Sequence, residues 1–387
     1  MTIQRLVLET IRCALDGTNL SAEACATVTP KVLEEIFKIT KLHDLAHLAA
    51  ESLDRNELIQ KNSDIGKLFF KQRRMAVYRY EQLNYEYARI CALLEQAKIP
   101  YIPLKGSVIR SLYPEPWMRT SCDIDIFVRK EDLDRATACF LSELNYKNEG
   151  TGTHDVQLYS ETGVHLELHY DLIEECRYAE IAQVLSTVWD NVALVANSKY
   201  CYHMSDELFY FYHIAHMTKH FEMGGCGIRS FIDLWLLEQD ALDKREKRDA
   251  LLEKAKLLTF ANAARRLAEV WFSGAESDSL TEEMQQYVFS GGVYGTIDNQ
   301  IAVERKKGTG KFKYILSCIF LKYDDMKITY PVLQKHKWLF PFYQVGRWLR
   351  ILFRGVSKST KEKLKVNASM PKEKEEQVSL LLQKLGL

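Results

Sequence analysis

The chain has 387 residues, 47% of them hydrophobic, and its 52 lysines and arginines equal its 52 aspartates and glutamates. This length predicts two or three domains, or one core with large additions. A neutral chain argues against a dedicated nucleic-acid-binding protein, which would usually be basic, so no stable nucleic-acid complex is expected.

The cysteines and the apolar runs indicate in which cellular compartment the protein is expected. None of the nine cysteines stands in a CxxC arrangement, which is typical of reduced thiols in a cytosolic protein. Residues 1–17 are amphipathic with an early glutamate, unlike a secretory signal. The longest clean apolar run, Tyr314 to Leu321, is far too short to span a bilayer. We therefore expect a cytoplasmic protein without a transmembrane segment.

Residues 1–95 are predicted to form an N-terminal helical segment. Only two glycines and one proline interrupt it. Five apolar or aromatic residues near its end recur at spacings of three and four, which is one face of a helix: Tyr80, Leu83, Tyr87, Ile90 and Leu94.

Residues 96–200 are predicted to form an α/β core. The apolar run Tyr101–Leu104 precedes a Lys-Gly-Ser turn, and a short helix is expected over Ser107–Tyr113, stopped by two prolines. Asp123–Val128 alternates acidic and aliphatic residues, which is typical of a strand.

The second half of this core contains a further helix and a hairpin. The helix is expected over Glu131–Asn145. Asp155–Tyr159 and Val164–Tyr170 are predicted strands around a Glu-Thr-Gly turn. The middle of the chain is therefore mixed α and β.

After about residue 205, apolar residues again recur at the spacing of a helix. Residues 201–300 are predicted to be a helical domain, with a long charged helix from Ala241. Residues 301–387 are predicted to be a C-terminal helical extension with a charged, partly mobile tail after Gly355. The basic, aromatic piece at 336–355 would either lie on a membrane surface or pack as an amphipathic helix on the body; we prefer the second interpretation.

Asp123 and Asp125 point to the same face of their strand, about 6.6 Å apart. Two negative charges at that distance repel by about 0.6 kcal/mol in water and about 2.5 kcal/mol at an effective dielectric of 20. Neutralising either aspartate is expected to relieve this repulsion. A strand tolerates such a pair when a cation lies between the charges, and Mg²⁺ or Mn²⁺ is the natural candidate because hard cations prefer carboxylate oxygens.

The turn upstream of the acidic pair has features of a phosphate site. Gly106 removes the Cβ that would block a close approach, and the following helix start offers backbone N–H groups. Ser107 adds a hydroxyl. Lys105 and Arg119 add positive charge for a triphosphate, although Arg119 would equally suit an ion pair with an aspartate.

Glu167 is the candidate for a third carboxylate. His165, Glu167 and His169 alternate with leucines in VHLELHY, so the three polar side chains share one strand face. Two-metal phosphoryl chemistry places its ions about 4 Å apart, and three carboxylates suffice to bridge and cap such a pair. We interpret His169 as an orienting residue rather than a ligand.

A Gly-Ser turn, then Asp-x-Asp on a strand, then an acid on a later strand resembles the nucleotidyltransferase superfamily that includes DNA polymerase β and kanamycin nucleotidyltransferase. The stretches LKGSVIRSLYPEPWMRTSCDIDIFV, VHLELHYDL and HMTKHFEMGGCGIRSFIDL resemble more closely a bacterial family of uncharacterised nucleotidyltransferases, over residues 90–240. Two departures from the superfamily pattern are the 17 positions from Gly106 to Asp123 and the glutamate at position 167 instead of the commoner aspartate.

The resemblance implies an α+β fold, a nucleotidyltransferase-like mixed sheet core flanked by N- and C-terminal helical segments. It also implies Mg²⁺- or Mn²⁺-dependent transfer of a nucleoside monophosphate from an NTP to an acceptor hydroxyl, with release of pyrophosphate. Asp123, Asp125 and Glu167 would hold the metals, and Glu167 would also serve as base. The acceptor stays open between a small molecule, a protein and RNA.

The segment after residue 205 supplies secondary candidates. His213, His216 and His220 lie on one helix face; we expect them to pack against the core, with a substrate contact from His216 or His220, rather than bind a transition metal. Arg229 and Asp233 are four residues apart and are predicted to form a structural ion pair.

Two other functions remain open. One is a catalytically inactive, antitoxin-like binding module on the same fold, which the intact acids disfavour. The other is an Asp-x-Asp glycosyltransferase that holds Mn²⁺ and a nucleotide sugar. That enzyme class would place a nucleotide-binding α/β domain before the motif, whereas about 95 predicted helical residues precede it here.

Overall fold

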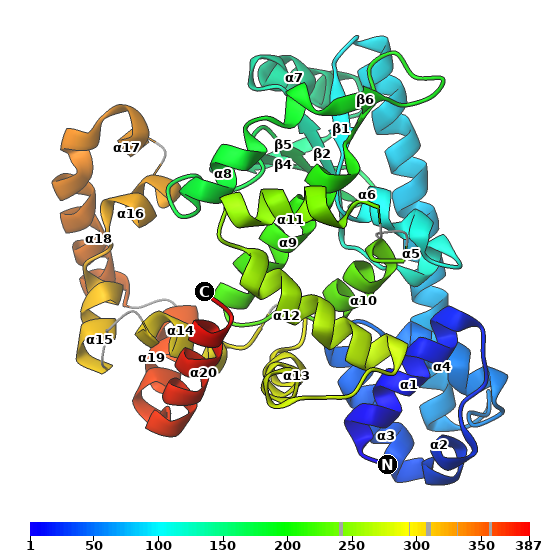
Figure 1. The fold of residues 1–387 in the computed structure, drawn as a ribbon. Helices are drawn as coiled ribbons and strands as arrows, with labels where there is room; N and C mark the ends of the chain where they lie inside the picture. Colours follow the sequence, from blue (N-terminus) through cyan, green and yellow to red (C-terminus); the bar gives the residue numbers. More distant parts are fainter. Residues whose placement is uncertain (240–242, 294, 307–310, 331, 356–357) are drawn as a thin grey trace.

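A computed structural model describes residues 1–387 except 240–242, 294, 307–310, 331 and 356–357. Its centre is a five-stranded mixed sheet in the order β1-β2-β5-β4-β3, with helices before and after it in the chain (Figure 1). The fold is therefore the predicted α+β class. The strands are β1 (Tyr101–Pro103), β2 (Asp123–Val128), β3 (Lys147–Thr151), β4 (Asp155–Tyr159) and β5 (His165–His169), and a separate two-stranded sheet pairs β6 (Val192–Leu194) with β7 (Tyr202–Met204).

Strands β2 and β5 run parallel, and their register sets the geometry of the acids. Asp125 lies opposite Glu167, and Asp123 lies opposite His165. The aliphatic residues between the acids, Ile124 and Ile126, are buried at 1% and 0% exposure. The predicted alternation is thus confirmed, because a period of two sends acids to one face and isoleucines to the other.

The N-terminal segment is helical, as predicted. Helix α5 is the longest, with 33 residues, and Ser63 caps its start by accepting a hydrogen bond from the backbone N–H of Gly66. Its second half belongs to the hydrophobic cluster under the sheet. The helices are α1 (Ile3–Asp16), α2 (Ala22–Thr27), α3 (Pro30–Leu42), α4 (Ala46–Arg55) and α5 (Asp64–Gln96).

Short helices connect the strands of the core. The predicted helix over Ser107–Tyr113 is a four-residue α-helix followed by a 3₁₀ turn, and the predicted helix over Glu131–Asn145 is shorter at both ends. Strands β3, β6 and β7 were not predicted, since β3 is exposed throughout and lacks an apolar alternation. The helices are α6 (Gly106–Ile109), α7 (Leu133–Glu143) and α8 (Ala179–Leu185).

The region after the sheet is a layer of helices. The single long charged helix predicted here is wrong: two helices meet at Lys256, whose φ of 61° cannot continue a right-handed helix. The predicted start at Ala241 lies outside the described residues. The helices are α9 (Asp206–Glu222), α10 (Ile228–Leu237), α11 (Arg245–Lys254), α12 (Leu258–Ala268) and α13 (Ser279–Gly291), with a π-helical turn at Glu269–Ser273.

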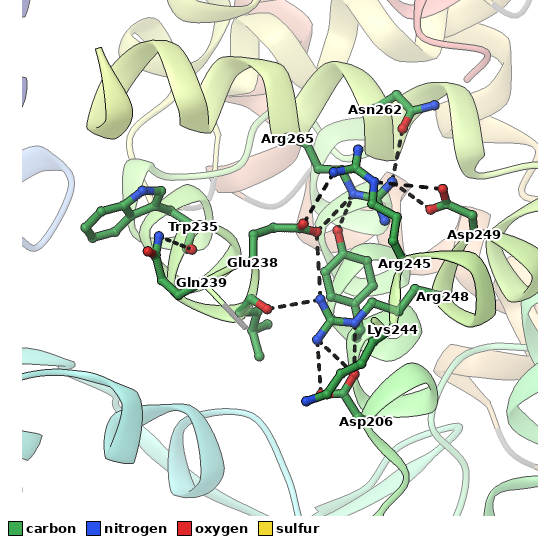
Figure 2. Close-up of polar contacts among 12 residues, drawn as sticks. Asp206, Trp235, Glu238, Gln239, Lys244, Arg245, Arg248, Asp249, Asn262 and Arg265 are labelled. Carbon is green, nitrogen blue, oxygen red and sulfur yellow. Dashed lines mark hydrogen bonds and ion pairs between the residues drawn. The ribbon is translucent and has the colours of Figure 1, made fainter. Parts of the chain in front are cut away.

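A buried charged network holds α9 against α10, α11 and α12 (Figure 2). The guanidinium groups of Arg248 and Arg265 lie 4.3 and 5.1 Å from the ring centre of Tyr210. Arg248 pairs with Asp206, and Arg265 pairs with Glu238. Both arginines are nearly fully buried, so their charges need these partners. The network fixes helix α9, which forms one wall of the site described below.

The C-terminal part is helical, and the partial mobility expected of the tail after Gly355 stays a prediction. Helix α20 packs on α13 and α14 and buries Val378, Leu381 and Leu382. Among the described residues, no helix is long and apolar enough to cross a membrane. The helices are α14 (Ile297–Lys306), α15 (Lys311–Ile319), α16 (Tyr323–Thr329), α17 (Val332–Lys335), α18 (Phe340–Arg354), α19 (Lys358–Ser369) and α20 (Lys372–Lys384).

Two hydrophobic clusters form the core. One lies under the sheet and includes residues from α5, α7 and strands β1, β2, β4 and β5. The other joins the N-terminal helices, α9–α13 and α20. The division into segments 1–95, 96–200, 201–300 and 301–387 stays a prediction.

Candidate active site

A cavity of about 470 Å³ lies where the open face of the sheet meets helices α9 and α10. The sheet wall carries the predicted acids Asp123, Asp125 and Glu167. The helical wall carries His216, Lys219 and His220 among others. An acidic wall thus faces a wall of lysine and histidine, in a space of the size that suits a small ligand.

The three acids form two overlapping groups of candidate metal ligands. One group is Asp123, His165 and Glu167, and the other is Asp125, Glu167 and His169; within each, the ligand atoms lie within 4.8 Å of one another. Glu167 belongs to both. The predicted position of Glu167, on the strand beside the aspartates and within reach of them, is confirmed.

Lys105 supplies a positive charge inside this acidic group. Its Nζ donates to Oδ1 of Asp125 at 2.7 Å and lies 3.8 Å from Oε2 of Glu167. The backbone of Lys105 has a φ of 42°, a conformation that side-chain-bearing residues seldom adopt and that often marks functional positions. In this structure, therefore, the lysine expected at the triphosphate neutralises the candidate metal-binding carboxylates.

His169 is the second partner of Asp125. Its Nε2 lies 2.9 Å from Oδ1 of Asp125 and 3.3 Å from Oε2 of Glu167. Burial alone would lower the pKa of His169, but the hydrogen bonds to the two carboxylates raise it overall. A proton on Nε2 orients both acids, which agrees with the predicted orienting role.

The acids differ in their electrostatics. Burial raises the pKa of Asp123, and the nearby charge of Asp125 raises it further. Burial would also raise the pKa of Asp125, but Lys105 and His169 hold it well below its usual range. Burial would raise the pKa of Glu167 too, but the hydrogen bond from His169 and the charges of Lys105 and His169 together lower it. The predicted repulsion therefore falls on Asp123, whereas Asp125 lies in an attractive field.

The glycine-serine turn only partly has the predicted form. The backbone N–H of Ser107 donates to the carbonyl of Leu104 at 3.1 Å, so it is already engaged. Neither Gly106 nor Ser107 is among the described residues that line the cavity. A Cβ on Gly106 would lie 2.5 Å from Nη1 of Arg119, so this glycine makes room for an arginine. The role of both residues in nucleotide binding stays a prediction.

Arg119 lines the cavity but is held by an aspartate. Its Nη2 donates to Oδ2 of Asp233 at 2.9 Å, and the hydroxyl of Tyr113 donates to Oδ1 of the same carboxylate at 2.7 Å. The predicted Arg229–Asp233 pair is wrong. Arg229 instead donates to the carbonyl of Thr120 at 2.8 Å and lies 3.4 Å from Oδ2 of Asp44, whereas Arg119 and Tyr113 occupy the carboxylate of Asp233.

His213, His216 and His220 share one face of α9 and line the cavity. The Nε2 of His213 lies 3.1 Å from the carbonyl of Ser230. Burial, assisted by the charge of Lys105, lowers the pKa of His216 well below its ordinary value and that of His220 to about 4. Both rings are neutral at pH 7. Among the described residues, the two groups with metal-ligand spacing lie on the sheet.

Lys219, Glu174 and His154 are three of the cavity residues that the sequence analysis did not single out. Glu174 accepts hydrogen bonds from Lys219 at 2.9 Å, and His154 stacks on His169 with ring centres 5.7 Å apart. Lys219 and His220 stand in the stretch HMTKHFEMGGCGIRSFIDL that resembles the nucleotidyltransferase family. The sequence therefore offered a reason to single out Lys219. His154 and Glu174 lie in loops, whose sequences show neither helical nor strand periodicity of apolar residues. Only the tertiary structure brings them to the site.

The comparisons with known proteins agree with the acidic face of the sheet. The chain belongs to a nucleotidyltransferase family, described as "Uncharacterised nucleotidyltransferase", whose family model matches residues 30–273. No curated protein and no solved structure matches the chain. The family supports a transferase acting on a nucleotide, and the match extends over most of the N-terminal helices, the sheet and helices α9–α12.

Proposed function

We propose that this protein transfers a nucleoside monophosphate from an NTP to an acceptor hydroxyl and releases pyrophosphate, by two-metal-ion catalysis. The observation that carries the proposal is the pair of ligand groups that share Glu167. Two ions about 4 Å apart would need a carboxylate that both can share, and Glu167 is the residue common to the two groups.

The side chains fit Mg²⁺ or Mn²⁺ chemically. Asp123, Asp125 and Glu167 offer hard carboxylate oxygens, and the Lys105 ammonium beside Asp125 and Glu167 indicates that the group attracts a cation. When bound, the metal ions would neutralise phosphate charge and polarise the transferred phosphoryl group.

The protein's own residues bind, orient and take up protons. His169 donates from Nε2 and fixes the carboxylate of Asp125. Glu167 is ionised at pH 7, because its pKa is lowered overall, so one of its oxygens can accept the proton of the acceptor hydroxyl. Lys219 lines the facing wall, 2.9 Å from Glu174, and would contact phosphate oxygens.

Nucleotide binding is proposed for the predicted Lys105, Gly106, Ser107 and Arg119. Lys105 would contact phosphate once a metal ion replaces it beside Asp125. Neutral His216 and His220 would contact the base or the acceptor by hydrogen bonds rather than by charge. The inactive, antitoxin-like module and the glycosyltransferase remain the alternatives, and the experiment below separates them.

The experiment has a binding arm and a turnover arm. Calorimetry with each NTP should give metal-dependent binding, which is weaker in Glu167→Gln. Incubation with α-labelled NTP, Mg²⁺ and a cell extract should release pyrophosphate and move the label to an acceptor. Metal-dependent NTP binding without pyrophosphate release would favour the inactive module. Binding of a nucleotide sugar but no NTP would favour the glycosyltransferase.

A further inference from the structure

Helices α15, α16, α17 and α18 form an arm, which we call the C-terminal arm. Figure 1 shows it at the left of the view, to the side of α14, α19 and α20. Helix α15 packs on α19, and Asp325 in α16 accepts a hydrogen bond from Arg177 at 2.6 Å. These contacts attach the arm to the rest of the chain.

Helix α18 turns its apolar face to solvent. Phe342, Val345, Leu349 and Phe353 are 67%, 47%, 49% and 80% exposed, and their spacing of three or four residues places them on one face. Trp338, just before the helix, is 68% exposed and contacts Phe342. The preferred prediction is an amphipathic helix that packs on the body; the helix is amphipathic, but these apolar residues do not make its packing face.

Polar bonds hold α18 in this orientation. Arg347 donates to the carbonyls of Cys318 and Ile319 at 2.6 and 2.8 Å, and the indole N–H of Trp348 donates to Ile319 at 2.8 Å. Gln344, only 6% exposed, donates to Leu321. The last carbonyls of α15 have no partners within their own helix, so the polar face of α18 satisfies them while its apolar stripe faces outward.

The arm is also basic, in a chain that is neutral overall. Residues 311–354 contain nine lysines and arginines and two aspartates. Lys335, Lys337 and Arg350 are exposed next to the apolar stripe. A second copy of the chain would bring the same positive charges to the contact, so self-association through this face is opposed by like-charge repulsion. The complementary surface is negatively charged.

We propose that the C-terminal arm binds the surface of a bilayer that contains anionic phospholipids. Helix α18 lies in the interfacial plane, with Phe342, Val345, Leu349 and Phe353 among the upper acyl chains. The lysines and Arg350 contact head-group phosphates. Trp338 has the amphipathic ring that suits this depth. The proposal is independent of the proposed catalytic function, since none of the arm's described residues lines the active-site cavity.

The experiment is co-sedimentation of the full chain with vesicles. Vesicles of phosphatidylcholine with 30% phosphatidylglycerol should bind the protein, whereas pure phosphatidylcholine should bind it at least tenfold less. Phe342→Glu with Leu349→Glu should abolish binding. Lys337→Glu with Arg350→Glu should weaken it by about fivefold or more for each charge, and 0.5 M salt should weaken the wild type.

The matched control is Tyr78→Glu with Leu141→Glu. These residues, in α5 and α7, are 63% and 40% exposed, so the pair adds the same charges to an aromatic and a leucine outside the arm. It should bind vesicles like the wild type, and circular dichroism should show all variants folded. Failure of the wild type to bind anionic vesicles, or equal loss in both pairs, would overturn the proposal. So would a concentration-dependent dimer in sedimentation velocity that Phe342→Glu with Leu349→Glu dissociates.

Discussion

The ammonium of Lys105 lies 2.7 Å from Oδ1 of Asp125. It stands between the acids of β2 and the acid of β5, and each of these acids belongs to a candidate metal group. A divalent cation that took the place of this ammonium on Oδ1 of Asp125 would displace Lys105 toward the ligand. We therefore predict that Lys105 and a divalent cation compete for this carboxylate.

Lys105→Met tests this competition. Without metal, the variant leaves the buried Asp125 beside Asp123 with His169 as its remaining partner, and we expect a loss of about 3 kcal/mol of unfolding free energy. Added Mg²⁺ should then raise the melting temperature of the variant more than that of the wild type. Thermal unfolding over a Mg²⁺ titration measures this. Lys219→Met, which removes a cavity lysine paired with Glu174, is the control; identical Mg²⁺ responses in all three proteins would refute the competition.

Asp123→Asn and Asp125→Asn should both abolish transfer but differ in stability. Burial and the charge of Asp125 raise the pKa of Asp123, so its neutralisation should cost nothing or stabilise slightly. Asp125→Asn removes the partner of Lys105 and His169 and should cost about 3 kcal/mol. Urea unfolding at pH 7 alongside the transfer assay distinguishes them. Near-normal transfer in either variant would contradict the proposed metal ligands.

Gly106→Ala should disturb the buried pair between Arg119 and Asp233. The new Cβ would lie 2.5 Å from Nη1 of Arg119, so the guanidinium must move, at an expected cost of about 1–3 kcal/mol. Urea unfolding measures the cost. Gly150→Ala is the matched control, since a Cβ there meets nothing within 4 Å. In an Arg119→Lys background the cost should shrink, and an undiminished cost would show that Arg119 is not the obstacle.

The buried histidine at position 220 should make stability depend on pH. Burial lowers its pKa to about 4, whereas the unfolded value is about 6.5. Between these values the unfolded chain binds more protons, so stability falls as pH drops from 6.5 to 4, by about 3 kcal/mol. His220→Gln should flatten this dependence in urea unfolding from pH 4.5 to 7.5. As a control, His203→Gln, at an exposed position, should show the same dependence of stability on pH as the wild type. An unchanged slope in His220→Gln would contradict the assignment.

The acidic strands were predictable because their information is local. A period of two in DIDIFV and in VHLELHY fixes which side chains share a face, wherever the strands lie. The hairpin turn makes β4 and β5 neighbours along the chain. The helices α1, α5 and α9 follow equally from their periodic apolar residues.

The partners of charged residues were decided by the tertiary structure. Helical spacing allowed Arg229 to pair with Asp233, but Asp233 receives Arg119 from a loop 114 residues away in the chain. Lys105 was expected at a phosphate and instead lies beside Asp125. A charge pairs with whichever opposite charge is nearest after folding, and burial excludes the water that would otherwise serve it.

The sequence by itself determined that α18 is amphipathic, but not which face it buries. An apolar stripe predicts that this stripe packs inward. Instead, Arg347 and Trp348 bond the orphan carbonyls at the end of α15, and Gln344 bonds the carbonyl of Leu321 just after it, so the polar face of α18 lies inward. The periodicity of apolar residues therefore specifies where strands and helices form and which side chains share a face. Whether a face points to the core or to solvent depends on which hydrogen-bond donors and acceptors the fold leaves unsatisfied.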